Sequence, residues 1–346
     1  MSELSIVGVG ARTAVGLNAL QTGFLLRAGF PAMTESPLAD AAGEPVTMAF
    51  VPTLDGRLTG AKRLLALARH PFIEAMEAVR GMPAEVMIGI DEGLACEADA
   101  RLGLAALAEE LLPGAKVTVS ARGETGLVAA LPAAVRALEL RQADAVILGG
   151  VHSDHDPGQI ASLESRGHLF SRENLDSRIP GEAAAFVVLM RAVEASGKKV
   201  ARLCDVRGHG LAREEVRGAA SAQGETGEPP AMAATALSSA IRAATEGLRR
   251  EGAAAGWLWT DLTTETRRIH EWGAAFVRAQ DVLARPYFVD SPAQRIGYLG
   301  AAALPLFAAT ACVAWRHGYA VSDTALGIAG TDSGERAALL LGRAGG

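Results

Sequence analysis

Short apolar runs alternate with segments of helical spacing along almost the whole chain, and this alternation restricts the fold more than any other feature. Strand-like runs in the first half are 4–13, 84–91, 143–151 and 181–191. Segments of helical spacing are 61–79, with a break or kink expected at His70-Pro71, 99–112 and 127–142. Strand and helix in repeated alternation are typical of sheets that contain parallel strands and are covered by helices.

The second half of the chain repeats this order of elements. Its strand-like runs are 200–210 and 256–263, its helical segments are 231–251, 264–283 and a buried helix at 299–315, and 325–343 predicts two strands around a glycine-rich turn. Two polar stretches, a charged loop at 153–177 and a glycine- and proline-rich stretch at 217–230, separate these elements. The similar order suggests an internal duplication, with one half at 1–195 and the other at 196–346.

The composition excludes several classes of partner. The net charge is −6 over 346 residues and no basic run occurs, so neither a nucleic acid nor a membrane surface is an expected partner. The N-terminal residues lack the pattern of a secretory signal, and 299–315 contains a proline and many small residues, which favours a buried helix over a membrane span. Cys96, Cys204 and Cys312 show no metal-ligand spacing, so we expect reduced, buried thiols in a cytoplasmic protein.

Four segments, taken in order, resemble the β-ketoacyl synthases of the thiolase-like superfamily. The stretch 117-VTVSARGETGLVAAL-131 predicts a strand, a tight turn and a helix, like the cysteine-bearing elbow of that family, and 145-AVILGG-150 is like its apolar strand ending in two glycines. The other three segments are like its Pro-Gly-Glu strand motif, its Ile-Gly-His segment and its C-terminal glycine turn: 176-DSRIPGEAAAFVVL-189, 294-QRIGYLGAAAL-304 and 327-GIAGTDSGERAALLL-341.

The resemblance implies a fold and a set of partners. The fold is an α/β, thiolase-like five-layer α-β-α-β-α sandwich of two pseudo-symmetric halves, with the elbow at 120–127. The family dimerises by pairing the strand next to the elbow helix across a two-fold axis, so we expect a homodimer. An acyl carrier protein or a paralogous synthase is a further possible partner by the same resemblance.

The residues that a condensing enzyme of this family needs are replaced at the matching positions. Such an enzyme holds an acyl group on a cysteine thiolate and uses two histidines to polarise a thioester; the matching positions here carry Glu124, Asp261 and Tyr298. A carboxylate is a poorer nucleophile than a thiolate. At a helix N-terminus we expect Glu124 to be an anion, as a helix cap or in an ion pair with Arg122 or an arginine of 264–272.

The resemblance therefore implies a degenerate β-ketoacyl synthase-like protein, a pseudoenzyme without condensing activity that acts as a binding or assembly partner. One alternative is an acyl-thioester hydrolase, decarboxylase or acyltransferase that uses Glu124 with Asp261 and Tyr298 for acid–base work. Another alternative is a non-catalytic heterodimer subunit of an active synthase. Arg178 replaces a gate residue of the family and would place a cation near the tunnel mouth, which is unfavourable for a long acyl chain.

Two further patterns were considered as binding sites. The segment 152-HSDHDP-157 holds two histidines and two aspartates, and these residue types suit zinc or manganese. Its spacing matches no ligand pattern, so we favour a solvated loop. Gly8 and Gly10 lack the third glycine and the distal acid of a dinucleotide fingerprint. We therefore expect neither a metal nor a cofactor.

Overall fold

The computed structural model describes residues 4–214 and 234–345, so the polar stretch predicted at 217–230 lies outside the described residues. The first half contains β1 (Leu4–Thr13), α1 (Ala19–Arg27), β2 (Thr34–Ala39), β3 (Pro45–Met48), α2 (Gly60–Met76), β4 (Ala84–Ile90), α3 (Glu97–Leu111), β5 (Lys116–Ala121), α4 (Gly126–Glu139), β6 (Ala145–Ser153), α5 (Pro157–Ser165), β7 (Glu182–Arg191) and α6 (Ala192–Gly197). The second half contains β8 (Cys204–Arg213), α7 (Thr235–Ala244), α8 (Glu246–Glu251), β9 (Ala255–Thr260), α9 (Thr266–Ala279), β10 (Leu283–Asp290), α10 (Ala293–Ile296), α11 (Ala303–Arg316), β11 (Thr324–Gly330) and β12 (Glu335–Arg343). Short 3₁₀ turns are η1 (Glu77–Val79), η2 (Gly123–Thr125), η4 (Gln280–Val282) and η5 (Gly300–Ala302).

The main sheet consists of two five-stranded leaves that are joined where β1 pairs with β8 over Leu4–Ile6. The strand order is β5-β4-β6-β7-β1 in the first leaf and β10-β9-β11-β12-β8 in the second. In the first leaf β4 runs parallel to β5 and β6, and β7 runs antiparallel to β6 and β1. The second leaf has the same pattern, with β9 in place of β4 and β12 in place of β7.

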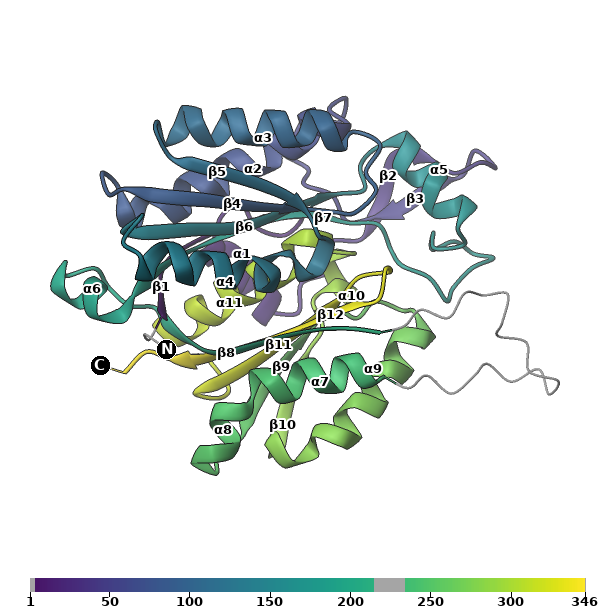
Figure 1. Ribbon diagram of the computed structural model, residues 1–346. Coiled ribbons are helices and arrows are strands. Elements are labelled where there is room, and N and C mark those ends of the chain that lie inside the picture. Colours follow the sequence, from purple (N-terminus) through teal and green to yellow (C-terminus); the bar gives the residue numbers. More distant parts are fainter. Residues whose placement is uncertain (1–3, 215–233, 346) are drawn as a thin grey trace.

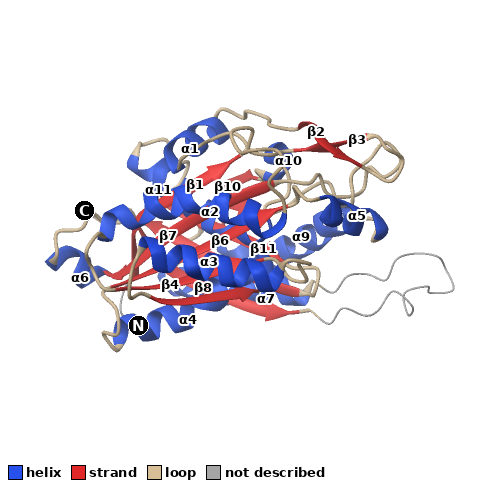
Figure 2. Cartoon of the chain, turned by 90° about the horizontal axis from the view of Figure 1, so that it is seen from above, coloured by secondary structure: helices blue, strands red, loops and turns tan. Residues whose placement is uncertain are grey.

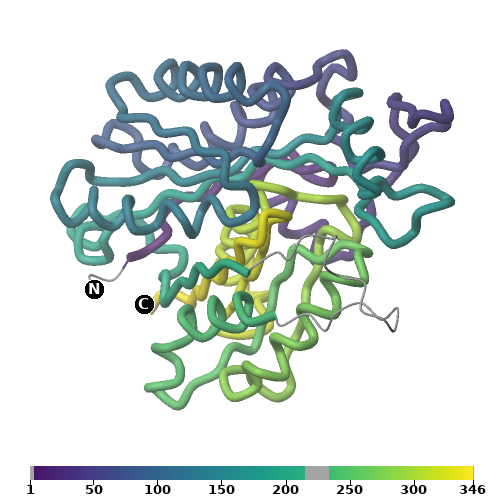
Figure 3. Tube along the Cα trace, turned by 45° about the vertical axis from the view of Figure 1, so that its right-hand side comes forward, coloured from purple at the N-terminus to yellow at the C-terminus, as the bar shows by residue number. Residues whose placement is uncertain are grey.

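The helices complete a five-layer sandwich. Figure 1 shows α4 and α11 between the two leaves, α2 and α3 on the outer face of the first leaf, and α7, α8 and α9 on the outer face of the second. Seen from above, α2 and α3 lie over the strands, and β2 and β3 form a separate hairpin at one end (Figure 2). Figure 3 shows the purple-to-teal half above the green-to-yellow half, with both termini at the same end of the molecule.

Helix α11 forms the centre of the core. All of its residues from Ala303 to Trp315 are buried, which explains why its sequence is apolar all round instead of having one apolar stripe. A helix between two sheets has no face toward water, and small residues such as alanine let both sheets approach it closely. No helix among the described residues is long and apolar enough to cross a membrane.

Most of the predicted strands and helices are confirmed, but the prediction of a break at Pro71 is wrong. Helix α2 continues through Pro71, which is buried in it. Its buried face packs against β1, and this packing stabilises the helix by more than the loss of one backbone hydrogen bond destabilises it. A β-carbon on Gly10 would lie 2.0 Å from the carbonyl oxygen of Pro71, and one on Gly8 would lie 2.4 Å from that of Ala75. These glycines therefore allow close helix–strand packing.

Other predicted element boundaries need correction. The charged stretch at 153–177 contains α5, whose N-cap Asp156 accepts a hydrogen bond from the backbone N–H of Gln159 at 3.0 Å and is followed by Pro157 at the first helical position. The helix predicted at 231–251 is divided at Thr245 into α7 and α8 within the described part. The sequence reading missed β2, β3 and β10; β10 is an edge strand whose side chains are mostly exposed, so its apolar pattern is weak.

The Glu182 carboxylate of the Pro-Gly-Glu motif has a structural role. It pairs with the Arg63 guanidinium at 2.6 Å, and both side chains are fully buried. It also accepts hydrogen bonds from the Val51 backbone N–H and the Ser153 hydroxyl, at 2.6 and 2.8 Å. This network joins α2 to β7 and to the end of β6. The repeated strand order is what a duplication would produce; the boundary between residues 195 and 196, which falls inside α6, stays a prediction.

Candidate functional site

The elbow predicted at 120–127 is a strand, a 3₁₀ turn and a helix. Strand β5 ends at Ala121, the turn η2 follows, and α4 begins at Gly126. Gly123 has a positive φ of 51°, a backbone conformation that favours glycine. Glu124 is directed into the protein at this turn, and only 4 % of its surface is exposed.

Tyr298 lies opposite the elbow and contacts Glu124 directly. Its backbone N–H donates to the Ile179 carbonyl at 2.8 Å, and Gly297 before it has a φ of 72°. A β-carbon on Gly297 would lie 2.6 Å from the Pro180 carbonyl oxygen. Both the positive φ and this close approach therefore require glycine at the turn. The Tyr298 hydroxyl donates a hydrogen bond to Glu124 Oε1.

Glu124 is held in its neutral form at neutral pH. Burial raises the pKa of its carboxyl group to about 8; the Tyr298 hydrogen bond opposes this change, and the charges of Asp332 and Asp261 add to it. Burial also raises the pKa of Tyr298 well above its ordinary value, so the phenol remains the donor. The expectation of an anionic Glu124 paired with an arginine is wrong, because Arg122 pairs with Glu335 at 2.5 Å and Arg268, in the stretch 264–272, pairs with Asp261 at 2.8 Å.

Asp261, which follows β9, faces the same space. Its Oδ2 accepts from the Arg268 guanidinium at 2.8 Å and from the Gly330 backbone N–H at 2.9 Å. Its Oδ1 is buried and has no hydrogen-bond partner among the described residues. Burial works against the charge of Arg268, but Asp261 and Glu271 together raise the pKa of its guanidinium, so the ion pair with Asp261 persists.

Arg178 closes the opposite side of the cluster. Its guanidinium carbon lies 4.4 Å from the centre of the Tyr298 ring, a cation–π geometry. It also pairs with Asp332 at 2.8 Å and with Glu265 at 3.2 Å. The cation that the sequence predicts near this position is therefore present, and it is engaged in ion pairs.

The predicted site residues Glu124, Asp261 and Tyr298 line one small cavity, together with Arg178, Thr263, Glu265, Arg268, Gly330 and Asp332. The space open to water in it is about 10 Å³, enough for roughly one water molecule. The lining contains no cysteine and no histidine. In this conformation the cavity has no room for an acyl chain.

A second buried polar cluster lies behind Tyr298, and the sequence reading missed its composition. His152 Nδ1 and Nε2 hydrogen-bond to Asp91 Oδ2 at 2.6 Å and to Asp154 Oδ2 at 3.1 Å. Burial opposes charge on His152, but the two carboxylates together raise its pKa well above the ordinary value, so the ring is an imidazolium. The ring also meets that of Tyr298 edge-on, at a centroid distance of 5.0 Å. Asp91 follows β4 and His152 is the last residue but one of β6, so adjacent parallel strands bring them together.

The segment 152–157 is not a solvated loop. His152, Asp154 and His155 are almost completely buried, which contradicts the expectation of a solvated loop. No group of three or more metal-binding side chains is found among the described residues. His155 packs against Phe50 at a centroid distance of 5.7 Å.

The cysteines lie outside the cavity lining. The sulfur atoms of Cys204 and Cys312 are 3.0 Å apart in the core between β8 and α11, and all three cysteines are free thiols. Cys96 precedes α3 and is partly exposed, so the expectation that all three are buried is wrong for it. None of the three is placed where it could hold an acyl group at the elbow.

Comparisons with known proteins agree with this architecture. Residues 111–195 match the family model described as the N-terminal domain of β-ketoacyl synthase. A search of curated protein sequences found no match.

Three solved structures illustrate the similarity in fold. A type II PKS ketosynthase in complex with its acyl carrier protein aligns over 99 % of this chain and 100 % of its own, with a TM-score of 0.80 and 14 % identity. The ketosynthase from module 6 of the bacillaene synthase of Bacillus subtilis aligns over 99 % and 72 %, with a TM-score of 0.78 and 16 % identity. The ishigamide ketosynthase/chain length factor aligns over 99 % and 100 %, with a TM-score of 0.78 and 17 % identity. The chain thus has the fold of these ketosynthases, and its residues 111–195 are similar to the N-terminal domain of β-ketoacyl synthase.

Proposed function

We propose that this protein is a non-condensing relative of the β-ketoacyl synthases that acts as a binding or assembly partner. The observation that carries the proposal is the residue at the elbow. Glu124 is buried, hydrogen-bonded to Tyr298 and enclosed in a cavity with room for about one water molecule. A protein that condenses acyl chains needs both a nucleophile and space at this point.

The chemistry of Glu124 supports the loss of acyl transfer. A carboxyl group whose pKa is raised to about 8 is mostly protonated at pH 7, and a neutral carboxylic acid is not a nucleophile. The ion pairs of Arg178 and Arg268 surround the cavity with charge. Burying an acyl chain there would require these pairs to separate, and breaking buried ion pairs is costly.

The partner that we propose first is a second copy of the chain, joined through β5. This strand forms a ladder with β4 alone among the described strands, so no described strand covers its other edge. The compared structures include a ketosynthase complexed with its acyl carrier protein and a ketosynthase/chain length factor. By analogy, a paralogous synthase is the second candidate partner, and the protein would then be the non-catalytic subunit of a heterodimer.

Catalysis is tested with thioester substrates. The purified chain is incubated with malonyl-CoA and hexanoyl-CoA, and release of thiol, carbon dioxide and β-ketoacyl product is followed. We expect no release above the rate without protein. Condensation product formed at a rate proportional to protein concentration would contradict the proposal.

Assembly is tested by sedimentation velocity. Successive residues of a strand direct their N–H groups to opposite edges, and proline has no N–H group. One of the variants Thr118→Pro and Val119→Pro therefore removes a donor from the outer edge of β5, and the other removes a donor that faces β4. We expect the wild type to be a dimer. The folded proline variant that lacks the donor on the outer edge should be a monomer. The control variants Thr118→Val and Val119→Ile keep both N–H donors and should remain dimeric. A folded wild-type monomer that also fails to bind a co-expressed Cys-containing paralogue would contradict the partner proposal.

One observation supports a second candidate function, acid–base chemistry on an acyl thioester without a covalent intermediate. Glu124 has a pKa of about 8, and the unpaired Oδ1 of Asp261 lies on the same cavity. A general acid works best when its pKa lies near the working pH. If thiol release from either CoA ester is detected, Glu124→Gln should abolish it and the exposed Glu173→Gln should not.

A further inference from the structure

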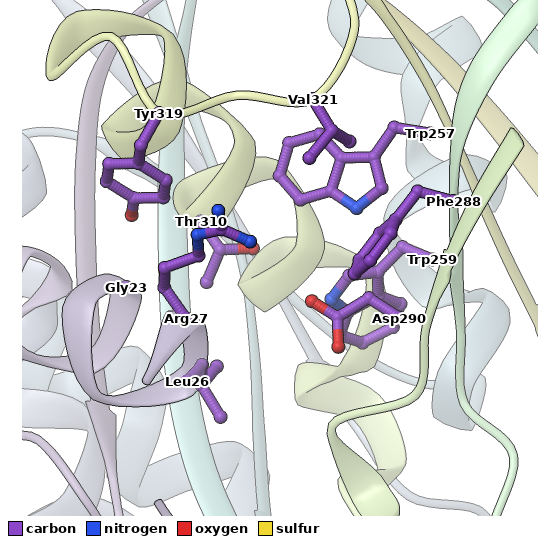
Figure 4. A pocket seen from close by; sticks show the side chains of 10 residues that line it. All are labelled: Gly23, Leu26, Arg27, Trp257, Trp259, Phe288, Asp290, Thr310, Tyr319 and Val321. Carbon is purple, nitrogen blue, oxygen red and sulfur yellow. The ribbon is translucent and has the colours of Figure 1, made fainter. Parts of the chain in front are cut away.

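A second cavity, which shares no lining residue with the Glu124 cluster, lies between α1, β9, β10, α11 and the segment that follows α11. The space open to water in it is about 30 Å³, room for two or three water molecules. Figure 4 shows its lining: Arg27 and Tyr319 lie on one side, and Trp257, Trp259 and Phe288 lie on the other.

The aromatic wall is built on neighbouring strands. Trp257 and Trp259 are two positions apart in β9 and therefore face the same side of the sheet. Trp257 packs edge-on against Trp315 at 6.3 Å and Trp259 packs against Phe307 at 5.7 Å, which fixes both indoles. Phe288 of the edge strand β10 is 46 % exposed and stands at the mouth of the cavity.

The polar groups left without partners at this cavity are donors. The indole Nε1 of Trp257, a residue only 7 % exposed, and the hydroxyl of Tyr319 are buried atoms with no hydrogen-bond partner among the described residues. Burial raises the pKa of Tyr319 to about 12, although the nearby charge of Arg27 opposes this change, so the phenol keeps its proton. Arg27, which is exposed, also lines the cavity and forms no ion pair within the described part of the chain. Buried donors without acceptors are costly, and a bound ligand would remove that cost.

The other polar side chains on the lining, Asp290 and Thr310, each have a partner. The carboxylate of Asp290 pairs with Arg295 at 2.8 Å, and the hydroxyl of Thr310 donates to the Phe307 carbonyl at 2.9 Å. The two buried donors without partners, on Trp257 and Tyr319, therefore require hydrogen-bond acceptors, and the Arg27 guanidinium favours a negatively charged group. The aromatic wall adds a preference for a flat or apolar body.

We propose that this cavity binds a small monocarboxylic acid with an aromatic or branched apolar body. Its carboxylate faces Arg27 and Tyr319, and an acceptor oxygen lies within reach of the Trp257 indole. The apolar body extends over Phe288 at the open mouth, because the enclosed volume holds little more than the head group. A quaternary ammonium ligand, which aromatic cages often bind, is disfavoured by the cation of Arg27.

The test follows the four indole N–H signals of the ¹⁵N-tryptophan-labelled full chain by NMR, with the signal of Trp257 assigned from Trp257→Phe. Benzoate is the probe, benzamide is its neutral isostere and choline is the cationic competitor. We expect a saturable downfield shift of the Trp257 signal with benzoate, and binding of benzamide weaker by about tenfold, the size of one charge-assisted hydrogen bond. The signals of Trp272 and Trp315 should move less than that of Trp257.

Arg27→Gln should weaken benzoate binding by about tenfold or more, whereas Arg267→Gln, at an exposed helical arginine outside this cavity, should not change it. The retained indole signals report directly on whether each variant is folded. A Trp257 signal that benzoate does not move, equal binding of benzamide, tighter binding of choline, or unchanged benzoate affinity in a folded Arg27→Gln would each overturn the proposal.

Discussion

The pKa of Glu124 makes a specific prediction about stability and pH. In the folded protein, burial raises the pKa of this carboxyl group from its ordinary 4.5 to about 8. Between these two pH values the native state binds a proton that the unfolded chain has released. The free energy of unfolding therefore falls as the pH rises through this range, and Glu124→Gln removes this dependence.

The magnitude follows from the two pKa values. A pKa difference from 4.5 to about 8 corresponds to about 5 kcal/mol once the group is fully ionised, with about 3 kcal/mol already present at pH 7. The free energy of unfolding of Glu124→Gln, relative to that of the wild type, should therefore rise by about 2–3 kcal/mol from pH 5 to pH 7 and by about 4 kcal/mol from pH 5 to pH 9. Glutamine is nearly isosteric with the neutral acid and keeps a carbonyl that accepts from Tyr298.

The assay is urea unfolding of both proteins at several pH values between 5 and 9. The exposed Glu173→Gln controls for the loss of one carboxylate. If the stability difference between Glu124→Gln and the wild type does not change across this range, Glu124 is ionised throughout. The cavity would then be hydrated, and the reasoning that makes Glu124 a neutral group would be refuted.

Two further predictions concern the scaffold, and both are measured as the free energy of unfolding in urea. Arg63→Met leaves the buried carboxylate of Glu182 without its ion pair and should cost about 3–5 kcal/mol; a loss below about 1 kcal/mol, the size of an exposed pair, would show that the pair is hydrated. Gly150→Ala should cost at least about 1–3 kcal/mol, because the new β-carbon would lie 1.8 Å from the Ala301 carbonyl oxygen. Gly56→Ala, where a β-carbon meets nothing within 4 Å, should be nearly neutral; equal losses for the two would refute the packing argument.

The layers of the fold could be predicted because apolar periodicity reports burial directly. The run from Ala303 to Trp315 is apolar on every side, and the structure buries it on every side. Strand β10 could not be found in this way, since its exposed edge residues carry no alternation. Its place beside β9 depends on tertiary pairing, which local propensity does not encode.

The position of Glu124 at the site could be predicted, but its charge could not. Sequence position placed it at the start of a helix, where the helix dipole favours an anion. Burial instead favours the neutral acid, and so do the charges of Asp261 and Asp332, which are far from Glu124 in the sequence. Only the fold brings these groups together, so a local argument gave the wrong ionisation state.

Part of the missed cluster carried a usable signal. Asp91 follows one buried strand and His152 lies at the carboxyl end of another. Ligands and polar groups of α/β proteins gather at the carboxyl ends of parallel strands. Reading these two positions together would have predicted their contact, which is 2.6 Å. The expectation of a solvated loop at 152–157 rested only on the neighbours of His152 along the chain.

The central claim is that the elbow of this synthase-like fold does not hold an acyl group. Intact-mass spectrometry after incubation with hexanoyl-CoA tests it most directly, with peptide mapping to locate any adduct and Cys96→Ser to remove the one partly exposed thiol. We predict no hexanoyl adduct on any peptide of residues 117–131, in the wild type or in Cys96→Ser. A stoichiometric adduct at Glu124, or at any other residue of the elbow, would contradict the account.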